Sequence, residues 1–242
     1  MVPVENTPID ITYDMRTDAR GKDPDAASAT LRHYHQLLWS KPLPDATTFA
    51  LETNVGKNYL LHRSELGTHS LGSDTIVHTL RSFRGMSSIL EQVPAEWIEE
   101  MVQVGQTIAG HIVFPGNKIG RKSTINGARG FHPRIRDRWD LTLECIRRHY
   151  AGSPSPLSAT LDRYQDFFAL FESFSGYVEF FLLQDHVSAD HSQVLFYLPC
   201  EDFQRSALPV SVDEYRQYYQ RTMAYITARA ERIDRWARIH LE

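Results

Sequence analysis

Hydrophobic and polar positions alternate near the start of the chain and then recur at helical spacing. Residues 9–16 place apolar side chains at every second position, and this period of two predicts a half-buried strand. The Gly-, Pro- and Asp-containing stretch 17–25 predicts a loop. From Ser28, an expected N-cap, apolar residues follow three and four positions apart, so a helix is predicted there.

The middle of the chain predicts further alternation of short strands and helices. Short apolar runs predict strands at 48–51, 59–62 and 107–114, whereas 67–73 is expected to be irregular. Helices are expected from Pro94 to Gly105, over 133–150, and from Ser158 to Gly176. The Gly-rich stretch 123–131 is expected to be a returning strand, a phosphate-facing loop or a plain turn.

The last third predicts two strands and one long helix. The runs 177–183 and 194–198 are apolar and short enough for neighbouring strands. Ser211 followed by Glu214 is a capping-box pattern, and helical spacing continues from there towards His240. We therefore predict an α+β fold: a single domain over 1–242 with a mixed or antiparallel sheet flanked by helices and a helix over 210–242 packed on it.

Composition narrows the class of protein without giving its activity. The 242 residues are 42 % hydrophobic and 23 % charged, which excludes a disordered chain, a collagen and a disulfide scaffold. No run of 18 apolar residues predicts a membrane span, and the first ten residues do not resemble a secretory signal. Cys145 and Cys200 are expected to be buried thiols, and a cytoplasmic protein is expected.

Charge is uneven along the chain. The segment 118–150 holds nine basic and three acidic residues, a net +6, so the remainder carries −10 within the total of −4. Such a basic segment on an acidic body suggests a site for a polyanion, either nucleic acid or a dinucleotide. An alternative stays open, in which the segment is a solvated helix face paired with acidic neighbours. The candidate nucleic-acid-binding residues are Lys118, Arg121, Lys122, Arg129 and Arg134.

Glu179 is the most informative single residue because it stands in an otherwise apolar run. Burying an unpaired carboxylate costs several kcal/mol, so three outcomes are open. Glu179 faces solvent, pairs with a buried arginine, or lines a cleft as a catalytic acid or base. Asp14 and Arg16 share one face of the first predicted strand, where Arg16 suits a phosphate or forms a surface ion pair.

Other polar clusters carry weaker signals. His62, Arg63 and Ser64 follow a predicted strand, with Ser73 and Asp74 a little farther on. A Ser–His–Asp triad can be drawn from these residues, but the G-x-S-x-G elbow is missing. The histidines and cysteines do not fall at metal-ligand spacing, so no metal is expected.

Two stretches resemble an uncharacterised family of bacterial and phage-associated proteins, known only as a domain of unknown function. They are YDMRTDARGKDPDAASATLRHYHQLLWSKPLP and TINGARGFHPRIRDRWDLTLECIRRHY. The resemblance extends over nearly the whole chain and implies no activity.

A second resemblance bears on function. The pattern YVEFFLLQDHVSADHSQVLFYLP is similar to the last catalytic strand of ADP-ribosyltransferases, particularly nucleic-acid-modifying toxins and RNA 2′-phosphotransferase relatives. That resemblance implies that Glu179 orients the ribose hydroxyl of NAD and the incoming nucleophile, and that Arg16 contacts NAD. It also implies that Tyr34 or Tyr59 stacks on nicotinamide, with His62, Arg63 and Ser64 as a competing NAD-facing set.

The leading hypothesis is therefore an ADP-ribosyltransferase-like toxin or defence effector that uses NAD as substrate, with nucleic acid as a candidate acceptor and an antitoxin as a candidate partner. In this hypothesis Glu179, Arg16 and Tyr34 are catalytic. The alternative is a non-enzymatic module that binds nucleic acid or a protein. A metal-independent ribonuclease is a minor alternative.

Overall fold

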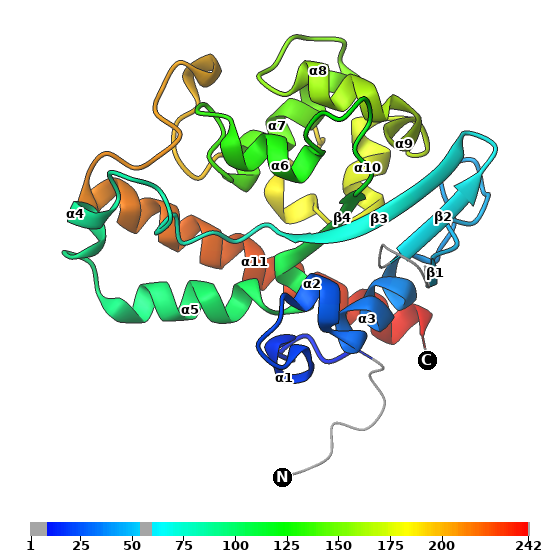
Figure 1. Ribbon diagram of the computed structural model, residues 1–242, viewed down its shortest axis with the longest axis horizontal. Helices are drawn as coiled ribbons and strands as arrows, with labels where there is room; N and C mark the ends of the chain where they lie inside the picture. The colour runs from blue at the N-terminus through cyan, green and yellow to red at the C-terminus, as the bar shows by residue number, and fades with distance from the viewer. Residues whose placement is uncertain (1–8, 54–59, 242) are drawn as a thin grey trace.

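A four-stranded sheet lies at the centre of the computed structural model, which describes residues 9–53 and 60–241 (Figure 1). The strands are antiparallel and follow chain order: β1 (Glu52–Thr53), β2 (Leu60–Ser64), β3 (Gly67–Thr75) and β4 (His111–Pro115). The predicted α+β fold with an antiparallel sheet is thus confirmed. The strand expected at 107–114 is shorter than predicted: β4 begins at His111 and is buried along its whole length, and the preceding η1 (Ile108–Gly110) is a 3₁₀ turn.

Helices cover the sheet on both sides (Figure 1). Above it in the figure lie α6 (Ile125–Phe131), α7 (Trp139–Tyr150), α8 (Ser158–Leu161), α9 (Gln165–Ala169) and α10 (Phe174–Phe180). Below it lie α1 (Arg16–Ala19), α2 (Pro24–Ala27) and α3 (Ala29–Trp39). α4 (Ser87–Leu90) and α5 (Ala95–Gly105) follow β3, and four short 3₁₀ turns occur in the described ranges: η1 (Ile108–Gly110), η2 (Asp162–Tyr164), η3 (Gln184–His186) and η4 (Glu201–Phe203).

The long helix α11 (Val212–His240) crosses the molecule and closes its core, as the sequence predicted (Figure 1). The Ser211 side chain caps its first turn by accepting a hydrogen bond from the Glu214 backbone N–H at 3.2 Å. Farther along, the buried Arg229 guanidinium donates to the carbonyls of Ala109 and His111 at 2.6 and 2.9 Å. α11 is therefore anchored to η1 and to the first residue of β4.

Two other helices also begin where the sequence predicted. The Ser28 hydroxyl accepts from the Leu31 N–H at 3.0 Å and caps α3. α5 starts directly after Pro94 and ends at Gly105. On α7 the residues Trp139, Leu143 and Ile146 are fully buried, and this helix begins at Trp139 rather than at 133. Both cysteines are buried and unpaired, as expected.

The strand predicted over 9–16 is wrong. Asp10 and Asp14 each accept a hydrogen bond from the backbone N–H two residues ahead, at 2.8 and 2.9 Å. These Asx turns bend the chain twice, so its alternating apolar residues reach the core without forming a strand. The loop predicted over 17–25 likewise contains α1 and the start of α2.

The strand predicted over 177–183 is also wrong, because Tyr177–Phe180 complete α10. The Ser173 hydroxyl caps this helix by accepting from the Gly176 N–H at 3.0 Å. Gly176 lies inside α10 rather than ending the preceding helix. A glycine is required at this position because a Cβ would collide with the Phe171 carbonyl oxygen. Residues 194–198 form no ladder either: Val194 makes an isolated bridge to Val187.

Three further predictions are corrected. Residues 67–73 belong to β3, a strand rich in Ser, Thr and His that lacks apolar alternation. The Gly-rich stretch 125–131 is the helix α6, capped by the Thr124 hydroxyl at 3.2 Å from the Gly127 N–H. Residues 48–51, predicted as a strand, precede the short strand β1, which begins at Glu52.

Candidate nucleic-acid interface

The residues predicted to bind NAD lie on separate elements. Glu179 projects from the outer face of α10 and is 64 % exposed, with its Oε1 4.0 Å from His191 Nδ1. Of the three outcomes left open for Glu179, the structure excludes the pair with a buried arginine among the described residues, because Glu179 faces solvent and lines an open pocket. Arg16 is the first residue of α1 and pairs with Asp14, with Nη2 2.5 Å from Oδ2. This surface pair holds the pKa of the Asp14 carboxyl below its usual value.

The remaining predicted NAD contacts are structural or dispersed. Tyr34 is buried on α3, where its hydroxyl accepts from the Asp10 N–H at 3.1 Å. His62 is buried and stacks on Phe49 with ring centres 4.0 Å apart, and burial lowers its pKa. Arg63 faces solvent, 3.7 Å from Glu52.

The last two predicted NAD-binding residues are Ser64 and Tyr59. The Ser64 hydroxyl is buried without a partner among the described residues, and Tyr59 lies outside the residues that the structure describes. Across residues 9–53 and 60–241, no hydrogen bond, ion pair or ring contact joins two members of the predicted NAD set.

A Ser–His pair exists in the structure, but from a histidine that the sequence did not single out. His35 Nε2 lies 2.9 Å from the Ser73 hydroxyl, and Trp39 Nε1 donates to His35 Nδ1 at 2.9 Å. Because Trp39 can only donate, Nε2 carries the imidazole proton and donates to Ser73. This tautomer cannot take a proton from the serine, so the pair does not form a catalytic triad.

Asp25 completes this interior cluster. Its Oδ1 accepts from the Ser73 N–H at 2.6 Å, and no ion pair to Asp25 occurs within the described ranges. Burial, more than the nearby carboxylates of Asp23 and Asp74, raises the Asp25 pKa to about 7. Only the fold brings these residues together, since Asp25 and Ser73 are 48 positions apart.

The basic segment 118–150 divides into buried and exposed cations. Arg129 is fully buried on the inner face of α6, and its Nη1 lies 2.5 Å from Asp74 Oδ2. The prediction that Arg129 binds nucleic acid is therefore wrong. Arg138 is also fully buried, 2.5 Å from Asp140. Arg147 and Arg148 both pair with Glu144.

The exposed cations are the other four candidates. Lys118, Arg121 and Lys122 lie on the segment between β4 and α6, and Arg134 follows α6. All four are exposed, and none forms an ion pair with another described residue. The open alternative of a paired, solvated face therefore fits Arg147 and Arg148 but not these four.

An open pocket of about 510 Å³ lies on the outer side of α6, and Phe83 and Arg136 line it from neighbouring segments. Phe131, at 84 % exposure, stands at its edge, and the Arg136 guanidinium lies 5.4 Å from the centre of the Phe83 ring. Polar groups reach the same space, because Asn126 and Asp137 also line it. The pocket thus combines aromatic faces, a cation and hydrogen-bonding side chains.

Buried Arg129 shapes this surface from below. Arg136 and Asp137 both adopt left-handed backbone conformations, with φ of 48° and 61°. Such conformations cost non-glycine residues on the order of 1 kcal/mol each, so the surrounding structure must hold them. Arg129 does so: its carbonyl accepts from the Asp137 N–H at 3.2 Å, and its Nη2 donates to the Asp137 carbonyl at 3.0 Å.

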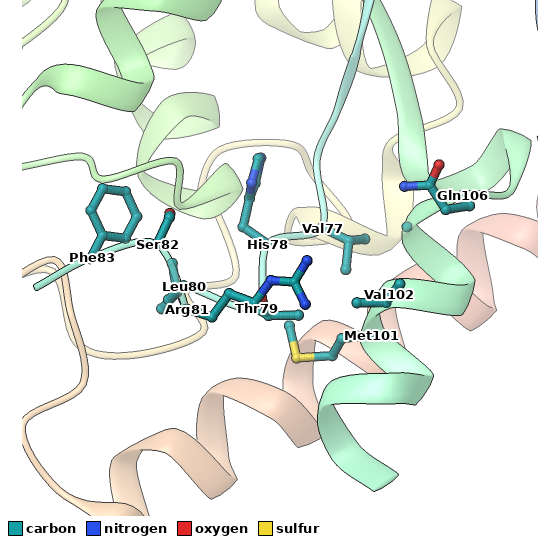
Figure 2. A pocket seen from close by; sticks show the side chains of 11 residues that line it. Val77, His78, Thr79, Leu80, Arg81, Ser82, Phe83, Met101, Val102 and Gln106 are labelled. Atoms are coloured by element: carbon teal, nitrogen blue, oxygen red, sulfur yellow. The ribbon is translucent and has the colours of Figure 1, made fainter. Parts of the chain in front are cut away.

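A second hollow, of about 240 Å³, lies behind the segment 77–83 (Figure 2). Figure 2 shows Arg81 extending its guanidinium across this hollow towards Val77 and Val102, while Phe83 points to the other side. Tyr218 fixes the segment from α11 by donating to the His78 carbonyl at 2.6 Å. The segment 77–83 therefore contributes to both hollows, because Ser82 and Phe83 line each of them.

An α+β protein with a cationic, aromatic-edged pocket is the class that the fold and this surface define. The chain belongs to the family of unknown function DUF6994, whose model matches residues 9–233. This confirms the resemblance to an uncharacterised family. No curated protein and no solved structure matches the chain. Among the described residues, no helix is sufficiently long and apolar to span a membrane.

Proposed function

We propose that this protein binds single-stranded nucleic acid on the outer face of α6. The observation that carries the proposal is the exposed Phe131, which lines a pocket together with Arg136. Phe131 ends a helix whose flanking segments carry four exposed cations without ionic partners in the described chain. Base–aromatic stacking contributes about 1–3 kcal/mol per base and tolerates any sequence. Phe131 and Phe83 supply the ring faces, and the pocket has room for one unstacked base.

The cations supply the second part of the interaction. Lys118, Arg121 and Lys122 lead into α6 and Arg134 leaves it, so cations without ionic partners among the described residues occur at both ends of this helix. Phosphates neutralised by such cations release counterions, which makes the affinity depend on salt. The acidic remainder of the chain, at −10, repels the strand elsewhere and favours binding on this face.

Single strands are favoured over duplexes by the shape of the site. A duplex keeps the faces of its bases stacked, whereas a single strand presents them to an exposed aromatic ring. Asn126 and Asp137 offer an amide and a carboxylate to the edge of a base held in the pocket.

Fluorescence anisotropy with labelled 15-nucleotide RNA, DNA and duplex tests the proposal. Wild type is compared with Phe131→Ala and with the matched control Ile239→Ala, which removes another exposed apolar side chain, at 75 % exposure on α11. We expect Phe131→Ala to weaken single-strand binding roughly 5- to 150-fold and Ile239→Ala to leave it unchanged. Equal affinities for all three proteins, or no binding below about 100 µM at low salt, would contradict the proposal.

Other functions expected from the sequence stay predictions. NAD-dependent ADP-ribosyl transfer, an antitoxin partner, metal-independent cleavage of RNA and a cytoplasmic location each await their own experiment. The anisotropy samples also address cleavage, because the RNA recovered from them can be sized on a gel.

A further inference from the structure

A lysine lies among aromatic rings from α3, α10 and α11. Lys41 follows the end of α3, and its Nζ lies 5.0, 4.8 and 4.9 Å from the ring centres of Trp39, Phe180 and Trp236. Neither an ion pair nor a side-chain hydrogen bond to Lys41 occurs within the described residues. The amine is therefore held by rings and by no acidic partner.

The same lysine lines an open pocket of about 420 Å³. Pro42, Leu43 and Phe180 form apolar walls, and Ser175 and Glu179 supply polar groups. Gly176 allows the wall formed by α10 to approach, since its missing Cβ would lie 3.3 Å from Pro44 Cγ and against the Phe171 carbonyl. An open pocket with both apolar and polar walls thus has this lysine in its lining.

Burial lowers the pKa of the Lys41 ammonium to about 7, and the charge of Arg229 acts in the same direction. The faces of the three rings attract a cation and oppose this shift. The other titratable groups around the pocket are Glu179, His191 beside Ser175, and His240, which stacks on Trp236. Near neutral pH a substantial share of Lys41 is then the neutral amine, which is its nucleophilic form.

We propose that Lys41 is a nucleophilic amine that forms an imine with a small aldehyde or ketone bound in this pocket. The neutral Nζ attacks the carbonyl carbon to give a carbinolamine. Loss of the former carbonyl oxygen as water, with the two protons released from nitrogen, leaves a carbon–nitrogen double bond, and no oxidant or reductant is consumed. The walls fit a compound with an apolar body, and Glu179 favours one that carries a hydrogen-bond donor or a positive charge.

This inference is independent of nucleic-acid binding, because α10 and the segment after α3 build the pocket and α6 does not. The test uses butanal as the probe, with sodium cyanoborohydride to reduce any imine to a stable amine. Peptide mass spectrometry then locates the adducts. The chain has only five lysines, and the exposed Lys22 and Lys118 serve as internal references.

We expect Lys41 to be alkylated at pH 7 at least tenfold faster than Lys118, although Lys41 is less exposed. The reason is that an ordinary lysine, with a pKa of about 10.4, is almost entirely protonated at pH 7. The rate at Lys41 is expected to reach half its maximum near pH 7. Slower labelling of Lys41 than of Lys118, or the same pH profile for both, would overturn the proposal.

Two controls separate reactivity from folding. Lys41→Met keeps an unbranched side chain within the cage and should abolish this adduct, whereas Lys118→Met should leave it unchanged. If Lys41→Met fails to fold, competitive acetylation of wild type in the absence of aldehyde measures the pKa of the same amine. A pKa near 10 in that experiment would refute the nucleophilic role.

Discussion

The interior beneath α6 and the outer face of α6 draw charged residues from one short segment and use them in opposite ways. Inside, Arg129 and Arg138 each contact a buried aspartate at 2.5 Å. Outside, Arg121, Lys122 and Arg134 face solvent without ion pairs in the described chain. The net charge of a segment thus includes its buried, paired arginines as well as its exposed cations, although only the exposed cations are available to a ligand.

The largest difference between the two regions should appear in stability. Arg129→Met leaves the Asp74 carboxylate buried without its cation and releases the backbone around Asp137, so we expect a loss of about 3–5 kcal/mol in the free energy of unfolding. Urea denaturation measures this loss. The matched exposed change, Arg134→Met, should cost less than about 0.5 kcal/mol, and similar losses in both variants would erase the distinction.

Asp25 sharpens the comparison because it is a mostly buried carboxylate without an ion pair in the described ranges. Its pKa of about 7 in the folded protein exceeds the ordinary 3.8, so the folded state binds the proton more tightly than the unfolded state. Protonated Asp25 therefore does not lower the free energy of unfolding at low pH. Its charge destabilises the fold increasingly as the pH rises from about 4 to 7.

Asp25→Asn should remove this penalty while retaining an oxygen for the Ser73 N–H. We expect the variant to be more stable than wild type at pH 8, by up to about 4 kcal/mol, and equal to it near pH 4. Thermal unfolding across this pH range measures the difference. Asp213→Asn, at an exposed position, is the control and should show no such pH dependence. A constant difference between Asp25→Asn and wild type would contradict the expected titration.

The outer region should respond in binding rather than in stability. Replacing both Arg121 and Lys122 by alanine removes two exposed cations, so we expect the slope of log affinity against log salt to fall by about 1.4 for a single strand. The midpoint of urea unfolding should hardly move. The same measurements on Arg235→Ala, an exposed arginine on α11, provide the reference. An unchanged slope for the double variant would place the strand elsewhere.

The smallest effect is expected at Glu179. Because its side chain is 64 % exposed on α10, Glu179→Gln should shift the melting temperature by less than about 1 °C. The folded variant then allows a clean test of the NAD prediction through nicotinamide release with and without RNA, DNA or cell lysate. Release that requires Glu179 would support ADP-ribosyl transfer, and its absence in wild type would remove that hypothesis.

A capping residue predicted a helix only where helical spacing of apolar residues followed it. Ser28 and Ser211 mark helix starts through their own side-chain hydrogen bonds, so α3 and α11 were identified. In contrast, Ser173 and Thr124 also cap helices, α10 and α6, that were not predicted. The run 177–183 is apolar apart from Glu179, and so short a run has no period that separates a helix from a strand. β3 was missed because its central position in the sheet, and not its own composition, stabilises it.

The candidate site divides in the same way. Sequence identified the cations of the interface, since charge is visible residue by residue, but it assigned Arg129 to the wrong side of α6. Phe131 carried no signal of its own, because an exposed phenylalanine and a core phenylalanine look alike in a sequence. Lys41 was missed because its cage joins α3, α10 and α11, which are far apart along the chain.

The contacts of α11 also determine when the protein can fold during its synthesis. Tyr218 on this helix bonds to the His78 carbonyl, 140 positions earlier, and Arg229 bonds to Ala109, 120 positions earlier. At translation rates of about 5–20 residues per second, β3 and β4 exist for several seconds before their covering helix is made. Through this interval the nascent sheet exposes apolar residues, so a chaperone that binds such surfaces should associate with it until α11 emerges.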